Sequence, residues 1–430
     1  MSNARSVAAI GGFWTFLGVS GQNAIRLVST LILTRLLAPE IFGLMSLALV
    51  VMTGLRLFSD FGIIPAIVRS PRGEEVSFLQ TAWTVKCIRG VGIAVVACLV
   101  AWPASKLYEE PVLFPVICAL SLTAIIGGFT SISIGTCKRQ IALRQITLME
   151  IFAQVLTTAA TILMSWLIES VWALVIGSIA GSIFQLILSY TMLPSFPHKF
   201  RLEKEALAEI VKFGRWIMIG TIMTFIGGNG NIIFIGYLLT ITELGFFTIA
   251  RTLSGAFAEI VNRILNNVAF PMFSSAARKS HADMVRAVGK VNLIVIFGAV
   301  PMFILLSICG QFIVDLLYDP RYAIAGSYLK ISALNGAIGV ISMPVQNAML
   351  ALGKSKQHAF VMFASAIFRI IGLFIGYYLW GTLGVLVGIG VGNTLTYMLS
   401  LSIGERYNVN RFWRNIWVPL LIMPLYVYAF

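Results

Sequence analysis

Hydrophobic residues fall into long, nearly uninterrupted runs along this chain, and short polar links separate the runs. An α-helix rises about 1.5 Å per residue, so roughly 20 apolar residues cross a bilayer core of about 30 Å. The pattern therefore predicts twelve membrane-spanning helices, over residues 9–33, 43–67, 77–102, 112–136, 146–168, 171–193, 210–239, 246–270, 287–308, 329–352, 357–379 and 382–403.

A polar link at 405–415 precedes one more apolar run, at 416–430. That run is too short to cross a bilayer without strain. We expect it to be an interfacial or half-length segment, or the start of a thirteenth helix.

Composition agrees with this pattern. Hydrophobic residues make up 58% of the 430 residues, and charged residues make up only 11%, against about 25% in soluble domains. The runs are also much longer than the strands of a membrane β-barrel, which alternate over about ten residues. The sequence predicts an all-α polytopic membrane protein.

The net charge of +14 would indicate a nucleic-acid partner in a soluble protein, but here most Lys and Arg lie in short loops. The loops after even-numbered helices carry most of these cations, which places the N-terminus in the cytoplasm. We therefore expect membrane lipid as a partner and no nucleic acid.

Two six-helix lobes are predicted, at 1–194 and 210–404, with a cytoplasmic linker at 195–209 and a C-terminal segment at 405–430. Shifting the sequence by 202 residues aligns Gly12 with Gly214 and Trp14 with Trp216. Because both halves would start in the cytoplasm, the repeats are expected to be parallel.

Charged residues interrupt several of these apolar runs. Arg56 and Asp60 are four residues apart in the segment 36–68, and so are expected to share one helical face beside each other. Glu259 and Arg263 have the same spacing in 246–270. A charge at membrane depth is costly unless it faces protein or water. We expect these two helices to line a central cationic cavity between the lobes; the alternative is a structural salt bridge in each helix.

An excess of arginine and lysine over acids is typical of a site for phosphate or pyrophosphate. The alternative for each cation is that it extends to the lipid headgroups. The expected substrate-binding residues are Arg26, Arg56, Lys86, Arg89, Arg251, Arg263, Arg369, Asn262 and Asn266. Three carboxylates within helices could couple transport to protons, namely Asp60, Glu150 and Glu259.

Glycine-rich stretches occur at 225–231 and 381–392. The second lies in an apolar run with no strand before it, so its Gly384, Gly388 and Gly392 predict close helix packing and not a nucleotide loop. The first should weaken its helix. No catalytic or metal-ligating constellation is indicated, so we expect neither an enzyme nor a cofactor.

Four stretches carry a family resemblance: TRLLAPEIFGLMSLALVV, FSDFGIIPAIV, ELGFFTIARTL and PMFSSAAR. The chain resembles the Wzx-type polysaccharide flippases of the multidrug/oligosaccharidyl-lipid/polysaccharide exporter superfamily. The resemblance implies two lobes around a cationic cavity and alternating access in the bacterial inner membrane. It also implies an undecaprenyl-pyrophosphate-linked oligosaccharide as substrate, with the polysaccharide polymerase machinery as a further partner.

Three other functions remain open at this point. A multidrug or cation antiporter of the same superfamily would favour an acidic cavity, whereas a lipid II flippase is hardly separable by sequence. A membrane polysaccharide polymerase would be expected to have a large outer loop, but the longest polar loops here are on the predicted cytoplasmic side.

Overall fold

The computed structural model of the chain describes all residues except 1, 229, 266–268, 407–416 and 430. Every element in the described part is helical, which confirms the all-α prediction. The chain divides into two compact units, Met1–Phe225 and Ile226–Phe430. The expected lobes and linker stay a prediction; the helix at the start of the expected second lobe belongs to the first unit up to Phe225.

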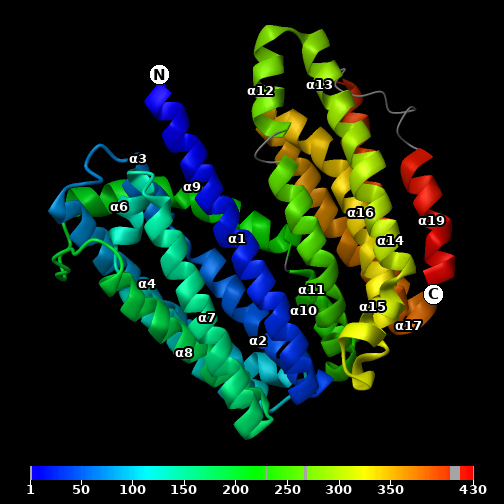
Figure 1. Cartoon of the computed structure of the whole chain (residues 1–430), viewed down its shortest axis with the longest axis horizontal. Helices are drawn as coiled ribbons and strands as arrows, with labels where there is room; N and C mark the ends of the chain where they lie inside the picture. The colour runs from blue at the N-terminus through cyan, green and yellow to red at the C-terminus, as the bar shows by residue number, and fades with distance from the viewer. Residues whose placement is uncertain (1, 229, 266–268, 407–416, 430) are drawn as a thin grey trace. The chain divides into compact units, whose positions relative to one another are not determined.

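Unit 1 is built around two packed helix pairs, α4 with α5 and α7 with α8, and α1 lies along α7 (Figure 1). Its helices are α1 (Ser2–Leu36), α2 (Pro39–Phe58), α3 (Ile63–Arg69), α4 (Val76–Leu107), α5 (Leu113–Phe129), α6 (Ser133–Arg139), α7 (Leu143–Ile168), α8 (Val171–Thr191) and α9 (Lys204–Gly228), whose last residues pass into unit 2.

A break separates α2 from α3 at residues 59–62. Gly62 has a φ of +57°, a left-handed conformation that glycine adopts without a steric penalty. Its amide also donates to Asp60 Oδ1 at 3.0 Å. Asp60 therefore lies in the break. The expectation that Arg56 and Asp60 share one helical face is wrong, because the helix ends at Phe58.

Unit 2 has α16 at its centre, in contact with α11, α14, α15 and α17. Its elements are α10 (Asn231–Leu238), α11 (Ile241–Ile264), α12 (Phe270–Lys279), α13 (His281–Ile294), the π-helix η2 (Val295–Ala299), α14 (Val300–Ile308), α15 (Gly310–Leu317), the 3₁₀-helix η3 (Pro320–Tyr322), α16 (Ala325–Ala351), α17 (Ser355–Arg406) and α19 (Trp417–Ala429).

Two glycine-rich stretches behave as predicted. Gly230 lies in a turn just before α10, so 225–231 contains a break. Within α17 the backbone is not helical at Trp380 and Gly381, and the chain folds back there. A Cβ on Gly376 would lie 2.0 Å from the Gly384 carbonyl oxygen, and one on Gly388 would lie within 2 Å of the Gly372 oxygen.

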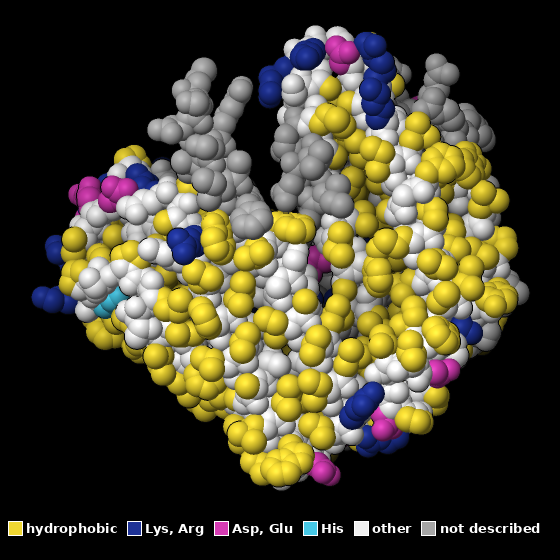
Figure 2. Space-filling model, viewed as in Figure 1, with side chains coloured by type: hydrophobic (Ala, Val, Ile, Leu, Met, Phe, Trp, Pro, Cys, Tyr) yellow, Lys and Arg dark blue, Asp and Glu magenta, His cyan; other side chains and the backbone are white. Residues whose placement is uncertain are grey.

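Among the described residues, nine helices are long and apolar enough to cross a membrane, or ten if the bent pair α5–α6 is one span. Of the twelve expected spans, 357–379 and 382–403 both fall within α17, and 210–239 falls on α9 and α10. The number twelve stays a prediction. Figure 2 shows hydrophobic side chains over the visible faces of the units. Many large ones are exposed, as on a surface that contacts lipid: Leu163, Trp166, Phe297 and Leu305.

The apolar run at the C-terminal end forms α19, which packs on α16. Tyr426 anchors it, since the phenol donates to Asn335 Oδ1 at 2.7 Å. The polar link before α19 lies mostly outside the described residues.

Candidate functional site

Three of the predicted cations meet in unit 1. Arg56 is in the last turn of α2, and Lys86 and Arg89 are one turn apart on α4. All three line a cavity of about 250 Å³, together with side chains of α5 and α8. One buried water needs only about 15 Å³ of such space, so this cavity has room for a larger polar group.

Hydrogen bonds fix each cation in place. Arg56 Nη2 donates to Thr123 Oγ1 at 2.7 Å. Arg89 Nη2 donates to the Arg56 carbonyl oxygen at 2.6 Å, and its Nε donates to Ser59 Oγ at 3.2 Å. Lys86 Nζ donates to the carbonyl oxygen of Thr130 at 2.9 Å and also to its hydroxyl. The cluster is thus pre-organised.

Asp60 pairs with Arg89, whose Nη1 lies 3.5 Å from Asp60 Oδ1. The sequence placed Asp60 beside Arg56 instead, and the helix break explains the change. Within the part of the chain that the structure describes, three cations and one carboxylate meet here, so the site has a net charge of +2 if all four are ionised. Such a site favours an anion with several oxygens.

Glycines let α4 and α5 approach closely enough to build this cluster. A Cβ on Gly90 would lie 2.6 Å from the Ala124 carbonyl oxygen, and one on Gly128 would lie 3.0 Å from the Lys86 oxygen. The close approach brings Lys86 against Thr130, which follows the end of α5.

Sequence reasoning missed the polar residues that hold the cations or line the cavity. Thr123 and Thr130 receive hydrogen bonds from the cations, and Ser182 and Gln185 on α8 line the wall. A weak signal existed: Ser182 and Gln185 are one turn apart in an apolar helix. The threonines carry none, because a hydroxyl in a helix can bond its own backbone, as Thr123 does with the Leu120 carbonyl oxygen.

Two other predicted residues of unit 1 lie on α1 and α7. Arg26 is exposed and its Nη2 donates to Asn23 Oδ1 at 2.9 Å. Glu150 accepts from Gln22 Nε2 at 3.0 Å, which links α7 to α1. Neither residue is among the lining residues of the Arg56 cavity.

The remaining predicted residues belong to unit 2. Arg251, Glu259 and Asn262 are partly buried on α11. Arg369 on α17 donates from Nε to Ser365 Oγ at 3.1 Å. The side chain of Arg263 and all of Asn266 lie outside the described residues, so the expected Glu259–Arg263 pair stays a prediction, as does a cavity shared by both lobes.

The segment 192–203, here called the strap, packs against the first turns of α4, just before Lys86. Gln80 Nε2 donates to the Pro197 oxygen at 2.9 Å, and the backbone amides of Arg201 and Glu203 donate to Thr84 and Thr81. These bonds explain why three polar side chains of α4, Gln80, Thr81 and Thr84, are buried.

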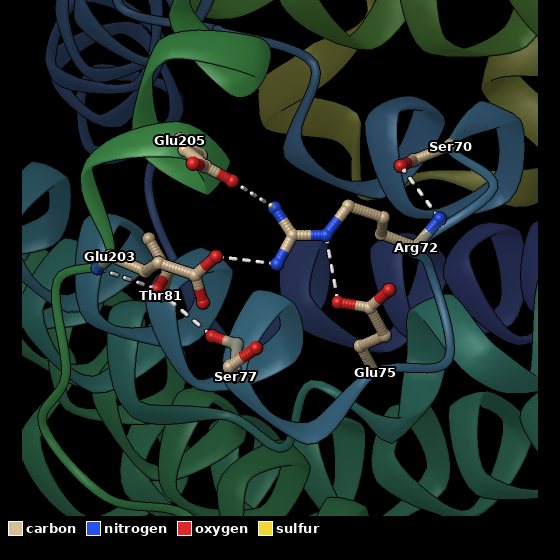
Figure 3. Close-up of polar contacts among 7 residues, drawn as sticks. All are labelled: Ser70, Arg72, Glu75, Ser77, Thr81, Glu203 and Glu205. Atoms are coloured by element: carbon tan, nitrogen blue, oxygen red, sulfur yellow. Dashed lines mark hydrogen bonds and ion pairs between the residues drawn. The ribbon is translucent and has the colours of Figure 1, made fainter.

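Arg72 fastens the end of the strap (Figure 3). Its guanidinium points toward three carboxylates: Nε lies 2.7 Å from Glu75, Nη1 lies 3.7 Å from Glu205, and Nη2 bonds Glu203. This arrangement raises the pKa of Arg72 and lowers the pKa of Glu203, mainly through their mutual hydrogen bond.

His198 lies in the middle of the strap among aromatic rings. Its centroid is 5.2 Å from Trp83, 4.9 Å from Tyr190 and 5.1 Å from Phe196. Nε2 accepts from the Ile132 amide at 3.2 Å, so the neutral ring holds its proton on Nδ1. Burial lowers the pKa of His198, and the nearby charge of Lys86 lowers it further.

Comparison with solved structures identifies the class of this fold. It is shared with an inward-facing multidrug resistance MATE family transporter of the MOP superfamily, at a TM-score of 0.70 and 14% identity, over 92% of this chain and 96% of that one. The fold is also shared with the lipid II flippase MurJ in an inward closed conformation, at a TM-score of 0.73 and 10% identity, over 97% of this chain and 98% of that one.

A family model for "Polysaccharide biosynthesis protein" matches residues 32–325, and the chain belongs to that family. Among curated proteins it is similar to the lipopolysaccharide biosynthesis protein WzxC of Escherichia coli K12, with 20% identity over 99% of this chain and 87% of the relative. The family resemblance seen in the sequence is thereby confirmed, as is membrane transport in polysaccharide biosynthesis.

Proposed function

We propose that this protein is a flippase that moves an undecaprenyl-pyrophosphate-linked oligosaccharide across the bacterial inner membrane for polysaccharide synthesis. The observation that carries the proposal is the convergence of Arg56, Lys86 and Arg89 on one cavity with a net positive charge. The family and the fold support a transporter; the cationic cavity supports a pyrophosphate as the group that it binds.

Each cavity residue then has a part in binding. Arg56 and Arg89 offer planar guanidinium groups, which suit the paired oxygens of a pyrophosphate. Lys86 adds a compact charge, while Ser182 and Gln185 can hydrogen-bond sugar hydroxyls. Asp60 holds Arg89 when the cavity is empty and competes with the substrate for it, so it also aids release.

Transport by this route needs the cavity to open alternately to the two sides of the membrane. We propose twelve spans in two lobes, an N-terminus in the cytoplasm and rocking of the lobes for that purpose. Arg251, Arg263 and Arg369 of unit 2 are proposed to contribute cations from the second lobe, with Asn262 and Asn266 as polar wall residues. Proton coupling through Asp60, Glu150 or Glu259 is a further part of this proposal.

A deletion strain analysed for lipid-linked intermediates tests the function. We expect undecaprenyl-linked repeat units to accumulate on the cytoplasmic side, whereas accumulation of lipid II would identify a peptidoglycan flippase instead. If neither intermediate accumulates and resistance to cationic drugs falls, the flippase proposal is refuted in favour of an antiporter.

Variants of Arg56 test the role of the cavity. A hydrogen bond to a charged group contributes about 1.5–3 kcal/mol, so Arg56→Ala should lower transport roughly 10- to 100-fold. Arg56→Lys keeps the charge without the planar fork and should lie between. The measurement is the rescue of polysaccharide export in the deletion strain at equal protein abundance.

Arg144→Ala is the matched control, because Arg144 is exposed and lies over the Trp14 ring at 5.6 Å, away from the cavity lining. It should rescue export fully. Equal rescue by Arg56→Ala and Arg144→Ala would make Arg56 a structural residue.

A further inference from the structure

A second cationic cavity lies in unit 1, where the end of α3 faces the first turns of α9. It has a volume of about 490 Å³ and shares no lining residue with the Arg56 cavity. Its lining residues are Ala66, Arg69, Ser70, Pro71, Glu209, Lys212, Phe213 and Arg215. Three cations and one carboxylate among these described residues give it a net charge of +2.

One cation of this cavity is held in place by an aromatic ring. The Arg69 guanidinium lies 4.7 Å from the centre of the Phe213 ring, a cation–π contact that fixes its plane. Lys212 is the neighbour of Phe213 on α9, and Lys212 and Arg215 are three residues apart, so both project from one side of that helix. Glu209 is three residues before Lys212.

Apolar side chains are part of the same lining, namely Ala66, Pro71 and Phe213. Next to two lining cations in the sequence, Val68 on α3 and Val211 on α9 are 43% and 45% exposed. A group bound here would therefore meet both charged and apolar side chains. A free phosphate ion gains nothing from the apolar part of this lining, whereas a phospholipid places its headgroup on the cations and its acyl chains on apolar side chains.

We propose that this cavity is a binding site for an anionic phospholipid of the leaflet next to α3 and α9, with a phosphodiester on Arg69 and Lys212. The net charge of +2 favours a lipid with one negative charge over a zwitterionic lipid. A headgroup that carries hydroxyls fits best, because Glu209 can accept from them. The site is independent of the transported substrate, so it stands even if the flippase function fails.

Native mass spectrometry of the purified full-length chain tests the site. Phosphatidylglycerol, phosphatidylcholine and inorganic phosphate are titrated separately. Wild type should bind phosphatidylglycerol more tightly than phosphatidylcholine. Each cation near an anionic surface contributes about 1 kcal/mol, so Arg69→Gln with Lys212→Gln should weaken that binding about 30-fold and leave phosphatidylcholine binding unchanged.

Arg144→Gln provides the control, since it removes another exposed arginine that stacks on an aromatic ring. It should bind lipid as wild type does. Lys212→Gln alone changes only one exposed side chain and guards against a folding defect in the double variant; it should weaken binding about fivefold.

Three results would overturn the proposal. One is full phosphatidylglycerol binding by the double variant, and another is an equal loss in Arg144→Gln. The third is displacement of the lipid by inorganic phosphate at matched concentration, which would make the cavity a site for free anions.

Discussion

Gly62 is the residue on which the α2–α3 break depends, and the break positions Asp60 beside Arg89. Its φ is +57°, and a Cβ at this position would lie 2.1 Å from Ile217 Cδ1. The residue is therefore constrained twice, by its backbone conformation and by the helix α9 that crosses the break.

Gly62→Ala should destabilise the protein. The left-handed conformation costs a non-glycine residue about 1–2 kcal/mol, and the new Cβ also requires the Ile217 side chain to move. We expect a lower Tm in detergent and weaker transport, because Asp60 and Arg89 lose their alignment.

Gly92→Ala is the comparison, since a Cβ there meets nothing within 4 Å in the middle of α4. It should leave Tm unchanged or raise it slightly, as alanine favours helix by about 0.5–1 kcal/mol. A Gly62→Ala protein with the Tm of wild type would show that the break tolerates a side chain.

At this scale the sequence revealed charges but not their partners. Three cations stand out because a charge in an apolar run is costly unless it faces protein or water. They are Arg56, Lys86 and Arg89, and the structure brings them together. Asp60 was paired with the wrong arginine because the spacing argument assumed an unbroken helix. Thr123 was missed because threonine is unremarkable in a membrane helix.

At the scale of elements, we expect the strap at 192–203 to respond to pH. The pKa of His198 is lowered in the folded protein, mainly by burial, so the released strap binds a proton more readily than the docked one. The stabilisation of docking is complete above the unperturbed pKa of about 6.5. It is lost as the pH falls through that value toward the lower folded pKa.

Hydrogen exchange of residues 192–203 should therefore rise between about pH 7.5 and pH 5.5, after correction for intrinsic exchange. His198→Gln keeps an acceptor for the Ile132 amide but does not titrate, so its exchange should not change over this range. The carboxylate of Glu203 does not interfere, because its pKa is lowered from 4.5. A pH response that persists in His198→Gln would exclude His198 as its origin.

The strap also marks the limit of sequence reasoning about elements. Helix positions follow from the long apolar runs, and the glycine contacts of α17 follow from the spacing of its glycines. An extended link such as 192–203 carries neither of these signals. Its docking depends on the tertiary contacts of Gln80, Thr81 and Thr84, which look like ordinary polar interruptions of an apolar run.

At the level of the whole chain, the number of membrane crossings depends most on α17. A straight helix over 356–406 would be about 77 Å long, more than twice the bilayer core. The glycine contacts between its halves show that it folds back instead. In agreement, its two ends meet, because Lys356 and Arg406 line one cavity of about 430 Å³.

We therefore expect two crossings, with both ends in the cytoplasm and the turn at Trp380 and Gly381 outside. In a chain that lacks its five native cysteines, Lys356→Cys and Arg406→Cys should react with an impermeant thiol reagent only in inverted vesicles. Tyr378→Cys, which replaces an 89% exposed side chain beside the turn, should react in intact cells with a permeabilised outer membrane. Labelling of positions 356 and 406 from opposite sides would mean one crossing, and the second lobe would then lack the helix that the six-plus-six repeat requires.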